Sequence, residues 1–332
     1  MLKRIIRCRL NLESTEQRME VFRGIPRPGK RVPCALTIGN FDGVHRGHQA
    51  LLARVAAAAQ ARGIVAAVMT FEPHPRELFT PDRAPTRISG LRDKFAALSD
   101  HGIDRVIVQH FNRAFASLTA EAFIEIVVRG CQARWLLVGD DFRFGARRAG
   151  DIGLLQRHAS QGAFELEQMP TVVEGEERIS SSAIRAALAA ADLGRARHLL
   201  GLAYAISGRV LHGRKLGREI GFPTLNLRVA HRHPAVRGVF AVRVHGLGPD
   251  ARPGVASVGL RPTVEDSGRW MLEVHLFDFA EQVYGRLVCV EFLQKLRDEE
   301  RYASLDELTA AIADDAARAR TLLATERPSA AA

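Results

Sequence analysis

The sequence contains few cysteines and no long apolar run, and the pattern at its start is not the one expected of a signal peptide. Its 332 residues include four cysteines, Cys8, Cys34, Cys131 and Cys289, which lie far apart and form neither a CxxC pair nor a compact Cys/His cluster. This spacing argues against a disulfide framework and a structural zinc site, and it is typical of a reducing cytoplasm. No stretch approaches the roughly 18 uninterrupted apolar residues of a membrane span. We therefore expect a soluble, cytoplasmic protein with no membrane partner.

The positive charge of the chain is concentrated at its N-terminus. Residues 1–31 hold nine Lys or Arg against three Glu, whereas 32–200 and 201–332 each carry a net charge of only +2. The total of +10 therefore does not indicate a nucleic-acid surface on either half, and we expect no nucleic-acid partner. The start, MLKRIIRCRL, lacks the apolar core of a signal peptide. An Arg-rich transit peptide is the alternative, and the three Glu count against it.

The order of apolar runs predicts an α/β first half. The length suggests two domains, at roughly 150 residues per domain. Short apolar runs alternate with longer periodic ones, which predicts strands at 34–38, 64–71, 103–109 and 134–139 and helices at 47–61, 91–101 and 119–130. Such alternation implies a parallel sheet flanked by helices. Two short helices near 181–190 and 192–200 close this half.

The pattern changes beyond Gly201. Strand-like runs separated by Gly and Pro lie at 203–212, 221–227, 237–245, 253–260, 270–278 and 284–293. No long helix is predicted until 304–324. A succession of short strands favours an antiparallel barrel or sandwich. We therefore expect an α/β domain at 19–200 and a β-barrel domain with a terminal helix at 203–325.

The string GNFDGVHRGH, residues 39–48, stands between a predicted buried strand and a helix. In open α/β sheets, ligands bind at the carboxyl ends of strands. His45 and His48 are three residues apart at the start of the helix, so they share a face. Two imidazoles beside the unpaired N–H groups of a helix N-terminus suit a polyphosphate. The alternative is a tight turn with two solvent-exposed histidines.

Two further strings carry possible phosphate ligands. GDDFRFG, 139–145, follows the strand 134–139, where Asp140 and Asp141 suit a metal or a ribose and Arg143 suits a phosphate. RISSSAIR, 178–185, combines cations with hydroxyls at a predicted helix N-terminus, which makes a phosphate cradle. The alternatives are a surface turn for the first string and a plain helix cap for the second.

Together these strings resemble the nucleotidyltransferase superfamily with an HxGH signature. Within it, GNFDGVHRGH, VGDDFRFG and RISSSAIR are similar to the adenylyltransferase module of bacterial bifunctional riboflavin kinase/FAD synthetases. The resemblance implies a Rossmann-like parallel-sheet domain over roughly 19–200. The family usually has SST where this chain has Ser180-Ser181-Ser182, and serine keeps the hydroxyl.

The second half has its own glycine-rich stretch, GRKLGREIGFPTLNL at 213–227. Its glycines recur every four residues and predict a loop that can approach a ligand closely. Thr224 and Asn226 are two apart and therefore point to the same side of a strand. Two neutral oxygens on one face can share a magnesium ion that keeps its waters.

The strand-like WMLEVHLFDF, 270–279, has one apolar face and one mixed face. The mixed face carries Met271, Glu273, His275 and Phe277. A carboxylate on such a face can accept a proton from a substrate alcohol. The alternative is that Glu273 and His275 simply face water.

GFPTLN, GLRPTV at 259–264 and LEVHLFDF resemble the riboflavin kinase module of the same family over roughly 203–325. The chain departs from the family pattern at Ser257-Val258-Gly259, where Asn-Ile-Gly is usual, and at Gln282-Val283-Tyr284-Gly285, where Asp-Leu-Tyr-Gly is usual. The resemblance implies that Glu273 is the catalytic base of the kinase. It also implies that Thr224 and Asn226 bind magnesium-ATP.

The resemblance and the loops together predict the remaining roles. His45 and His48 are predicted to be catalytic in the adenylyltransferase. Predicted ATP-binding residues are Gly39, Asn40, Phe41, Asp42, Gly43, Asp141, Arg178, Ser181, Ser182 and Arg185 in the first half, and Gly213, Lys215, Gly217, Gly221 and Pro223 in the second. Predicted flavin-binding residues are His74, Arg261 and His275.

The implied function is the phosphorylation of riboflavin to FMN and the adenylylation of FMN to FAD. ATP, riboflavin and FMN are the expected substrates and Mg²⁺ the expected cofactor, in a monomer or weak homo-oligomer. Three alternatives stay open: another HxGH nucleotidyltransferase, an RNA-binding protein that uses its basic N-terminus, and a flavin carrier with an inactive site.

Overall fold

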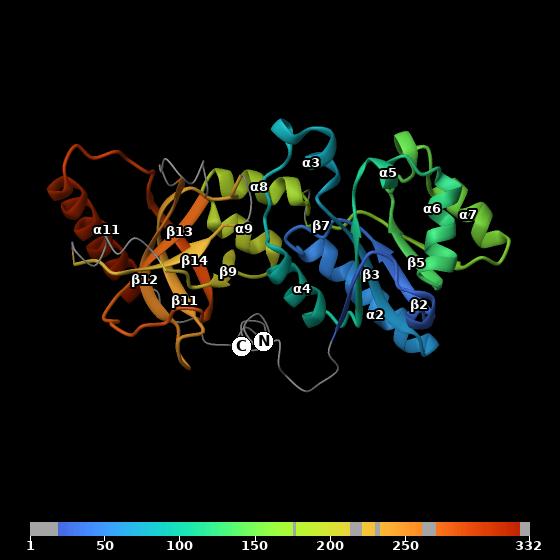
Figure 1. Ribbon diagram of the computed structural model, residues 1–332, viewed down its shortest axis with the longest axis horizontal. Helices are drawn as coiled ribbons and strands as arrows, with labels where there is room; N and C mark the ends of the chain where they lie inside the picture. Colours follow the sequence, from blue (N-terminus) through green and yellow to red (C-terminus); the bar gives the residue numbers. More distant parts are fainter. Residues whose placement is uncertain (1–18, 175–176, 213–220, 230–232, 261–269, 326–332) are drawn as a thin grey trace. The chain divides into compact units, whose positions relative to one another are not determined.

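The computed structural model describes residues 19–174, 177–212, 221–229, 233–260 and 270–325. Their contacts form two compact units, one of residues 19–85 and 94–180 and the other of residues 86–93 and 181–325. Each unit contains one six-stranded sheet (Figure 1). Within the described ranges, no helix has both the length and the apolar composition needed to cross a membrane.

The sheet of the first unit is parallel throughout, as the alternation of runs predicts. Its strands lie in the order β1 (Glu20–Arg23), β4 (Arg105–His110), β3 (Val65–Glu72), β2 (Cys34–Ile38), β5 (Ala133–Gly139) and β6 (Glu165–Met169). The chain runs outward from β2 through β3 to β4 and then returns to the other side of β2 to form β5. The topological switch point therefore falls between β2 and β5, where ligands bind in open α/β sheets.

Helices cover both faces of this sheet. On one face, α2 (Arg46–Arg62) and α4 (Leu91–Asp100) bury Leu52, Val55 and Leu98 against the strands. On the other face lie α6 (Ala120–Glu125) and α7 (Ile152–Ser160). The helix expected over 119–130 is α6 followed by a wider π-helical turn at Ile126–Gly130. The shorter helices are α3 (Pro75–Phe79) and α5 (Arg113–Ala116).

The sequence pattern did not predict the edge strand β6, which is fastened to α2 by ion pairs. Arg54 of α2 binds Glu167 of β6 at 2.6 Å, and Arg62 binds Glu165. Both guanidinium groups lie over the ring of the buried Trp135 of β5, at 5.8 and 5.6 Å from its centroid. These contacts join three elements whose residues are far apart in sequence, so only the folded chain reveals them.

The sheet of the second unit is antiparallel and nearly closed. Its strands lie in the order β10 (Thr224–Arg228), β13 (Trp270–Leu276), β12 (Arg252–Leu260), β11 (Gly238–His245), β14 (Leu287–Arg297) and β9 (Ala205–Arg209). Leu211, just after β9, forms a bridge with Asn226 of β10 and so joins the two edges. The terminal helix α11 (Leu305–Thr325) packs on β11 and β12, and its Ala316 and Ala319 join a buried cluster there. The predicted barrel with a terminal helix is confirmed.

Two helices lead from the first sheet towards the barrel in sequence. They are α8 (Ser181–Ala189) and α9 (Leu193–Leu200), and they follow the short hairpin of β7 (Val173–Glu174) and β8 (Glu177–Arg178). By contacts, both helices group with the barrel, and α9 packs on β14. The apolar residues Ala196, Leu199 and Leu200 of α9 are buried.

Gly145, at the end of the loop after β5, allows a close approach to α6 that gives a test of the fold. Its φ is 72°, and a Cβ there would lie 2.8 Å from the backbone of Ala120. Gly162 has a similar φ of 80° but nothing within 4 Å of its would-be Cβ. Both Gly→Ala changes cost roughly 1–2 kcal/mol for the left-handed φ. We expect Gly145→Ala to lower the free energy of unfolding by about 1–3 kcal/mol more than Gly162→Ala.

Urea unfolding of the two variants, followed at the transition of the α/β unit, checks this expectation. The Gly162→Ala protein is the matched control, because it is destabilised only by the left-handed φ and meets no steric overlap. Equal losses in the two variants would show that the loop relaxes away from α6.

Candidate functional site: two clusters of polar residues

The loops that follow β2 and β5 meet at the switch point of the parallel sheet. Residues 39–45 follow β2, and residues 140–145 follow β5, its hydrogen-bonded neighbour. The sequence placed GNFDGVHRGH and GDDFRFG at the carboxyl ends of strands, and the fold makes those two strands adjacent. Both loops therefore lie at the edge of the sheet where a ligand is expected.

The loop after β2 is wound tightly and holds two apolar side chains in the core. Phe41, Gly43 and Val44 have φ values of 48°, 86° and 41°, all in the left-handed region. A β-branched residue such as Val44 rarely adopts this conformation, and such strain persists only where the surroundings impose it. Phe41 and Val44 are 1% and 2% exposed. Their burial fixes the path of the backbone that leads to His45.

His45 and His48 stack on each other at the start of α2. Their ring centroids are 3.7 Å apart and their planes 17° from parallel. His45 is the N-cap, and its Nδ1 accepts the backbone N–H of His48 at 3.3 Å. Because that lone pair of Nδ1 is used, the proton of the neutral His45 ring sits on Nε2. The cap thus sets the tautomer that can donate a hydrogen bond to a ligand.

His48 is held neutral by its surroundings. Burial, followed by the charges of His45 and Lys94, lowers the pKa of His48 well below 6.5. Its ring also packs at 5.0 Å from that of Phe41. At neutral pH His48 is therefore a hydrogen-bonding group rather than a cation.

Two residues of this cluster were not identified from the sequence. Gly47 is one, because a Cβ there would lie 3.2 Å from the ring of His45 and would crowd the stacked histidines. The glycine inside the HRGH string was the available signal. Lys94 of α4 is the other, with a side chain only 1% exposed. Lysine is rarely buried, but nothing in the local sequence connects Lys94 with His48.

The acidic residues after β5 have separate partners. Asp141 binds Arg178 at 2.8 Å, which joins the GDDFRFG string to the first residue of RISSSAIR. Asp140 accepts hydrogen bonds from the backbone and the hydroxyl of Thr171, and Arg143 pairs with Asp151 at 3.3 Å. Asp140 and Arg143 therefore help to hold the loops, whereas Asp141 and Arg178 bring two predicted motifs together.

Other predicted residues of the first half have structural contacts of their own. Ser181, Ser182 and Arg185 lie in α8, which groups with the barrel, so their combination with the histidines stays a prediction. The guanidinium of Arg185 donates to the carbonyl of Thr86 at 2.6 Å. His74 caps α3 through Nδ1 and is 7% exposed. Asp42 is 1% exposed, so its carboxylate lies in the interior of the fold.

The second cluster lies on one face of the barrel, across β10 and β13. Asn226 is directly opposite Glu273, and Thr224 is directly opposite His275. Alternate residues of a strand share a face, so all four side chains lie on the same side of the sheet. The other face of β13 carries Leu272, Val274 and Leu276, all buried. The sequence predicted these two faces of the strand, but the pairing with β10 comes from the fold.

Contacts within this cluster order the FPTLN segment. Asn226 is 4% exposed, and its Nδ2 donates to the Thr224 carbonyl at 3.3 Å. The Nδ1–H of His275 donates to the carbonyl of Pro223 at 3.0 Å, and its ring meets Phe222 edge-on at 5.2 Å. His275 therefore holds Phe222 and Pro223 against β13. Gly221 makes the turn before them with a φ of 84°.

Some predicted residues fall outside the described ranges. They are Gly213, Lys215, Gly217 and Arg261. Phe277 was expected on the same face as Glu273 and His275. Its ring lies 6.0 Å from that of His275, and the side chain is buried in the cluster beneath α11 together with Val255, which is directly opposite His275.

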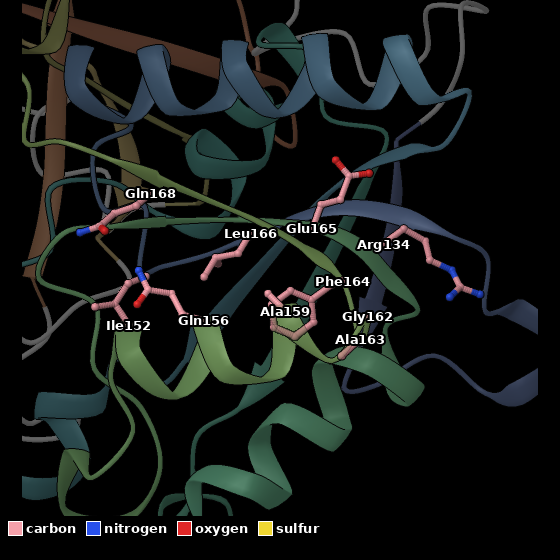
Figure 2. A pocket seen from close by; sticks show the side chains of 10 residues that line it. All are labelled: Arg134, Ile152, Gln156, Ala159, Gly162, Ala163, Phe164, Glu165, Leu166 and Gln168. Carbon is pink, nitrogen blue, oxygen red and sulfur yellow. The ribbon is translucent and has the colours of Figure 1, made fainter.

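A hollow of about 740 Å³ lies elsewhere, along β6 and α7. It is lined by Arg134, Ile152, Gln156, Ala159, Gly162, Ala163, Phe164, Glu165, Leu166 and Gln168. Figure 2 shows the carboxylate of Glu165 directed towards α2 and away from the hollow, consistent with its pairing to Arg62. None of its lining residues was predicted to bind a substrate. The histidine cluster and the barrel cluster, which gather the imidazoles and a carboxylate with candidate metal ligands, are therefore the candidates that we pursue.

Two family models match consecutive parts of the chain. The FAD synthetase model matches residues 28–183, and the riboflavin kinase model matches residues 200–323. The histidine cluster falls in the first match and the Glu273 cluster in the second.

Curated relatives match almost the whole chain. A protein of Escherichia coli (strain K12) named bifunctional riboflavin kinase/FMN adenylyltransferase is 48% identical over 317 residues, which cover 93% of this chain and 100% of the relative. A protein of the same name from Pseudomonas fluorescens is 47% identical, covering 92% of this chain and 98% of the relative.

A solved structure from Streptococcus pneumoniae, titled as a macrolide-efflux protein, has 28% identity and a TM-score of 0.73 and covers 93% of this chain and 99% of that chain. Its title names another activity than the curated relatives do. Those relatives are more similar in sequence, and both halves match flavin-enzyme models. The chain therefore belongs to the bifunctional riboflavin kinase/FMN adenylyltransferase family, with the adenylyltransferase in its N-terminal part and the kinase in its C-terminal part.

Proposed function

We propose that the two clusters are the two active sites, the barrel face for FMN formation and the histidine loop for FAD formation. The observation that carries the first assignment is the register of β10 with β13, which sets Asn226 opposite Glu273 and Thr224 opposite His275. Candidate metal ligands and a candidate base thus share one face. We place the kinase domain at 203–325 and the adenylyltransferase domain at 19–200.

Glu273 takes the proton of the terminal ribityl hydroxyl of riboflavin as that oxygen attacks the γ-phosphorus of ATP. The oxygen–phosphorus bond forms as the bond to the β-phosphate oxygen breaks, which yields FMN and ADP. Phosphoryl transfer depends mainly on alignment and on neutralising charge. A carboxylate within reach of the reacting hydroxyl supplies the general base. His275 positions Phe222 and Pro223 beside this site, and with Arg261 it is our candidate for contact with the flavin.

Thr224 and Asn226 suit a magnesium ion bound with ATP. A hydroxyl oxygen and an amide oxygen are hard ligands of the kind Mg²⁺ prefers, and the ion keeps waters in its other positions. Asn226 Nδ2 lies 3.5 Å from Thr224 Oγ1, and turning the amide over would bring two oxygens side by side at the cost of the hydrogen bond to the Thr224 carbonyl. The ion would neutralise phosphate charge there. Gly213, Lys215, Gly217, Gly221 and Pro223 complete our proposed ATP site.

In the N-terminal part, the phosphate of FMN attacks the α-phosphorus of a second ATP and pyrophosphate leaves. A phosphate is already a nucleophile, so this step needs charge stabilisation rather than a strong base. The ring of His45 and the neutral ring of His48 donate hydrogen bonds to the phosphates at the N-terminus of α2, where N–H groups and the helix dipole favour anions. We assign phosphate binding also to Gly39, Asn40, Gly43, Arg178, Ser181, Ser182 and Arg185.

The remaining assignments follow from this site. Phe41 and Asp42, both buried, shape the nucleotide loop and would meet ATP through their backbone. Asp141 orients Arg178. His74 is our candidate for the FMN pocket of this domain. We further propose that the protein acts in the cytoplasm as a monomer or weak homo-oligomer, with Mg²⁺ and without nucleic acid.

Substitutions in the two clusters should damage the two reactions separately. We expect His48→Ala to slow FAD formation about 100-fold or more, since one lost donor to a transition-state phosphate costs that much, and to leave FMN formation intact. His158→Ala, in α7, is the matched control. Chromatography of flavins over time, with riboflavin or FMN supplied with ATP and Mg²⁺, measures both steps.

The reverse loss is expected at the barrel. Glu273→Gln should slow FMN formation by about 10²–10⁴-fold, the usual contribution of a general base, and spare FAD formation from supplied FMN. Glu281→Gln controls for the loss of an exposed carboxylate. Loss of both activities from either variant in a folded protein would refute the two-site assignment.

The lowered pKa of His48 predicts how stability depends on pH. Below about pH 6.5 the unfolded chain binds a proton at His48, whereas in the folded chain His48 stays neutral. The free energy of unfolding therefore falls as the pH drops below 6.5. The slope contributed by one group is at most about 1.4 kcal/mol per pH unit. Thermal unfolding of the wild type and of His48→Asn between pH 7.5 and 5.5 should show a shallower decline in the variant. Identical slopes would mean that His48 titrates normally in the folded protein.

A further inference from the structure

The carboxylate of Glu299, just after β14, lies over strand β12. Its Oε1 accepts a hydrogen bond from the hydroxyl of Ser257 at 3.1 Å. Its carboxylate also occupies the space above Gly259, since a Cβ on that residue would overlap it. The hydroxyl of Ser257 binds the Glu299 carboxylate, and Gly259 leaves the space that it occupies. Together they keep Glu299 in one place on the sheet.

This place adjoins the proposed kinase base. Ser257 of β12 is directly opposite Glu273 of β13, and Asn226 of β10 is opposite Glu273 on its other side. The three residues form a row across neighbouring strands, which are about 4.8 Å apart. Glu299 extends the row beyond Ser257. Partial burial raises the pKa of the Glu299 carboxyl and the charge of Glu273 raises it further, whereas the Ser257 hydroxyl and Arg297 lower it. The two carboxylates are thus close enough to interact.

The second oxygen of Glu299 is available to a ligand. Among the residues that the structure describes, Oε2 accepts no hydrogen bond, and the side chain is exposed. The hydroxyl of Ser257 has a single proton, which it donates to Oε1.

We propose that Glu299 is a substrate-binding residue of the kinase reaction that selects the polyhydroxyl side chain of the acceptor. Its Oε2 accepts a hydrogen bond from an internal hydroxyl of the ribityl chain while Glu273 acts on the terminal hydroxyl. The inference rests on the proposed kinase site. A carboxylate is the strongest side-chain acceptor for a hydroxyl, and a polyol offers several hydroxyls along one chain. The spacing of the row suits a substrate laid across the strands.

The test compares riboflavin with an analogue whose side chain is an alkyl chain with only a terminal hydroxyl. We expect Glu299→Ala to lower kcat/KM for riboflavin about tenfold, mainly through KM, and to leave kcat/KM for the analogue unchanged. Gly259→Ala should do the same, because its methyl group displaces the carboxylate without removing it. Glu300→Ala is the matched control, and the thermal unfolding transition of the barrel unit reports that the kinase part of each variant is folded.

Two results would overturn the inference. An equal loss with both substrates would mean that Glu299 acts only on the shape or charge of the site, and no loss with either would mean that it does not contact the acceptor. Failure of the proposed kinase site is seen separately, as full FMN formation by Glu273→Gln.

Discussion

The pairing of strands that are distant in sequence is the constraint on which both sites depend. In the first unit, β2 pairs with β5 across the switch point, and the loops that follow these strands carry the histidines and Asp141. In the second, β10 pairs with β13, and Asn226 therefore faces Glu273. A shift of one residue in that second register would turn every side chain of one strand to the opposite face. The arrangement of side chains in each cluster is thus fixed by backbone hydrogen bonds between strands.

Each site also uses one side chain to hold another. The ring of His45 caps α2 and so fixes its own tautomer, and Gly47 leaves the room that this ring needs. On the barrel, His275 holds the carbonyl of Pro223, and Ser257 holds Glu299. A group that must meet a ligand in one geometry loses little entropy on binding when its neighbours have already oriented it. The neutral state of His48 has a similar origin, since burial beside other basic groups disfavours its charged form.

The sequence was a good guide to elements and motifs and a poor guide to partners. Alternating apolar runs predicted the parallel strands, and short runs between glycines predicted the barrel, because burial imposes these patterns locally. The edge strand β6 was missed because its attachment to α2 through Arg54 and Glu167 has no local pattern. Lys94 and Glu299 were missed for the same reason. Each is an ordinary charged residue in its own segment, and only its neighbours in space give it a role.

By itself, the sequence determined the two-part organisation, the strings GNFDGVHRGH and GFPTLN, and the two faces of the strand that carries Glu273. These properties reside in short segments, where residue type and spacing fix turns, caps and faces. Only the tertiary structure decided which segments became neighbours: the stacking of His45 on His48 beside Lys94, the joining of Asp141 to Arg178, and the row from Asn226 through Glu273 to Ser257. The reason is physical. Local backbone geometry acts over a few residues, whereas strand order and burial depend on the packing of the whole chain.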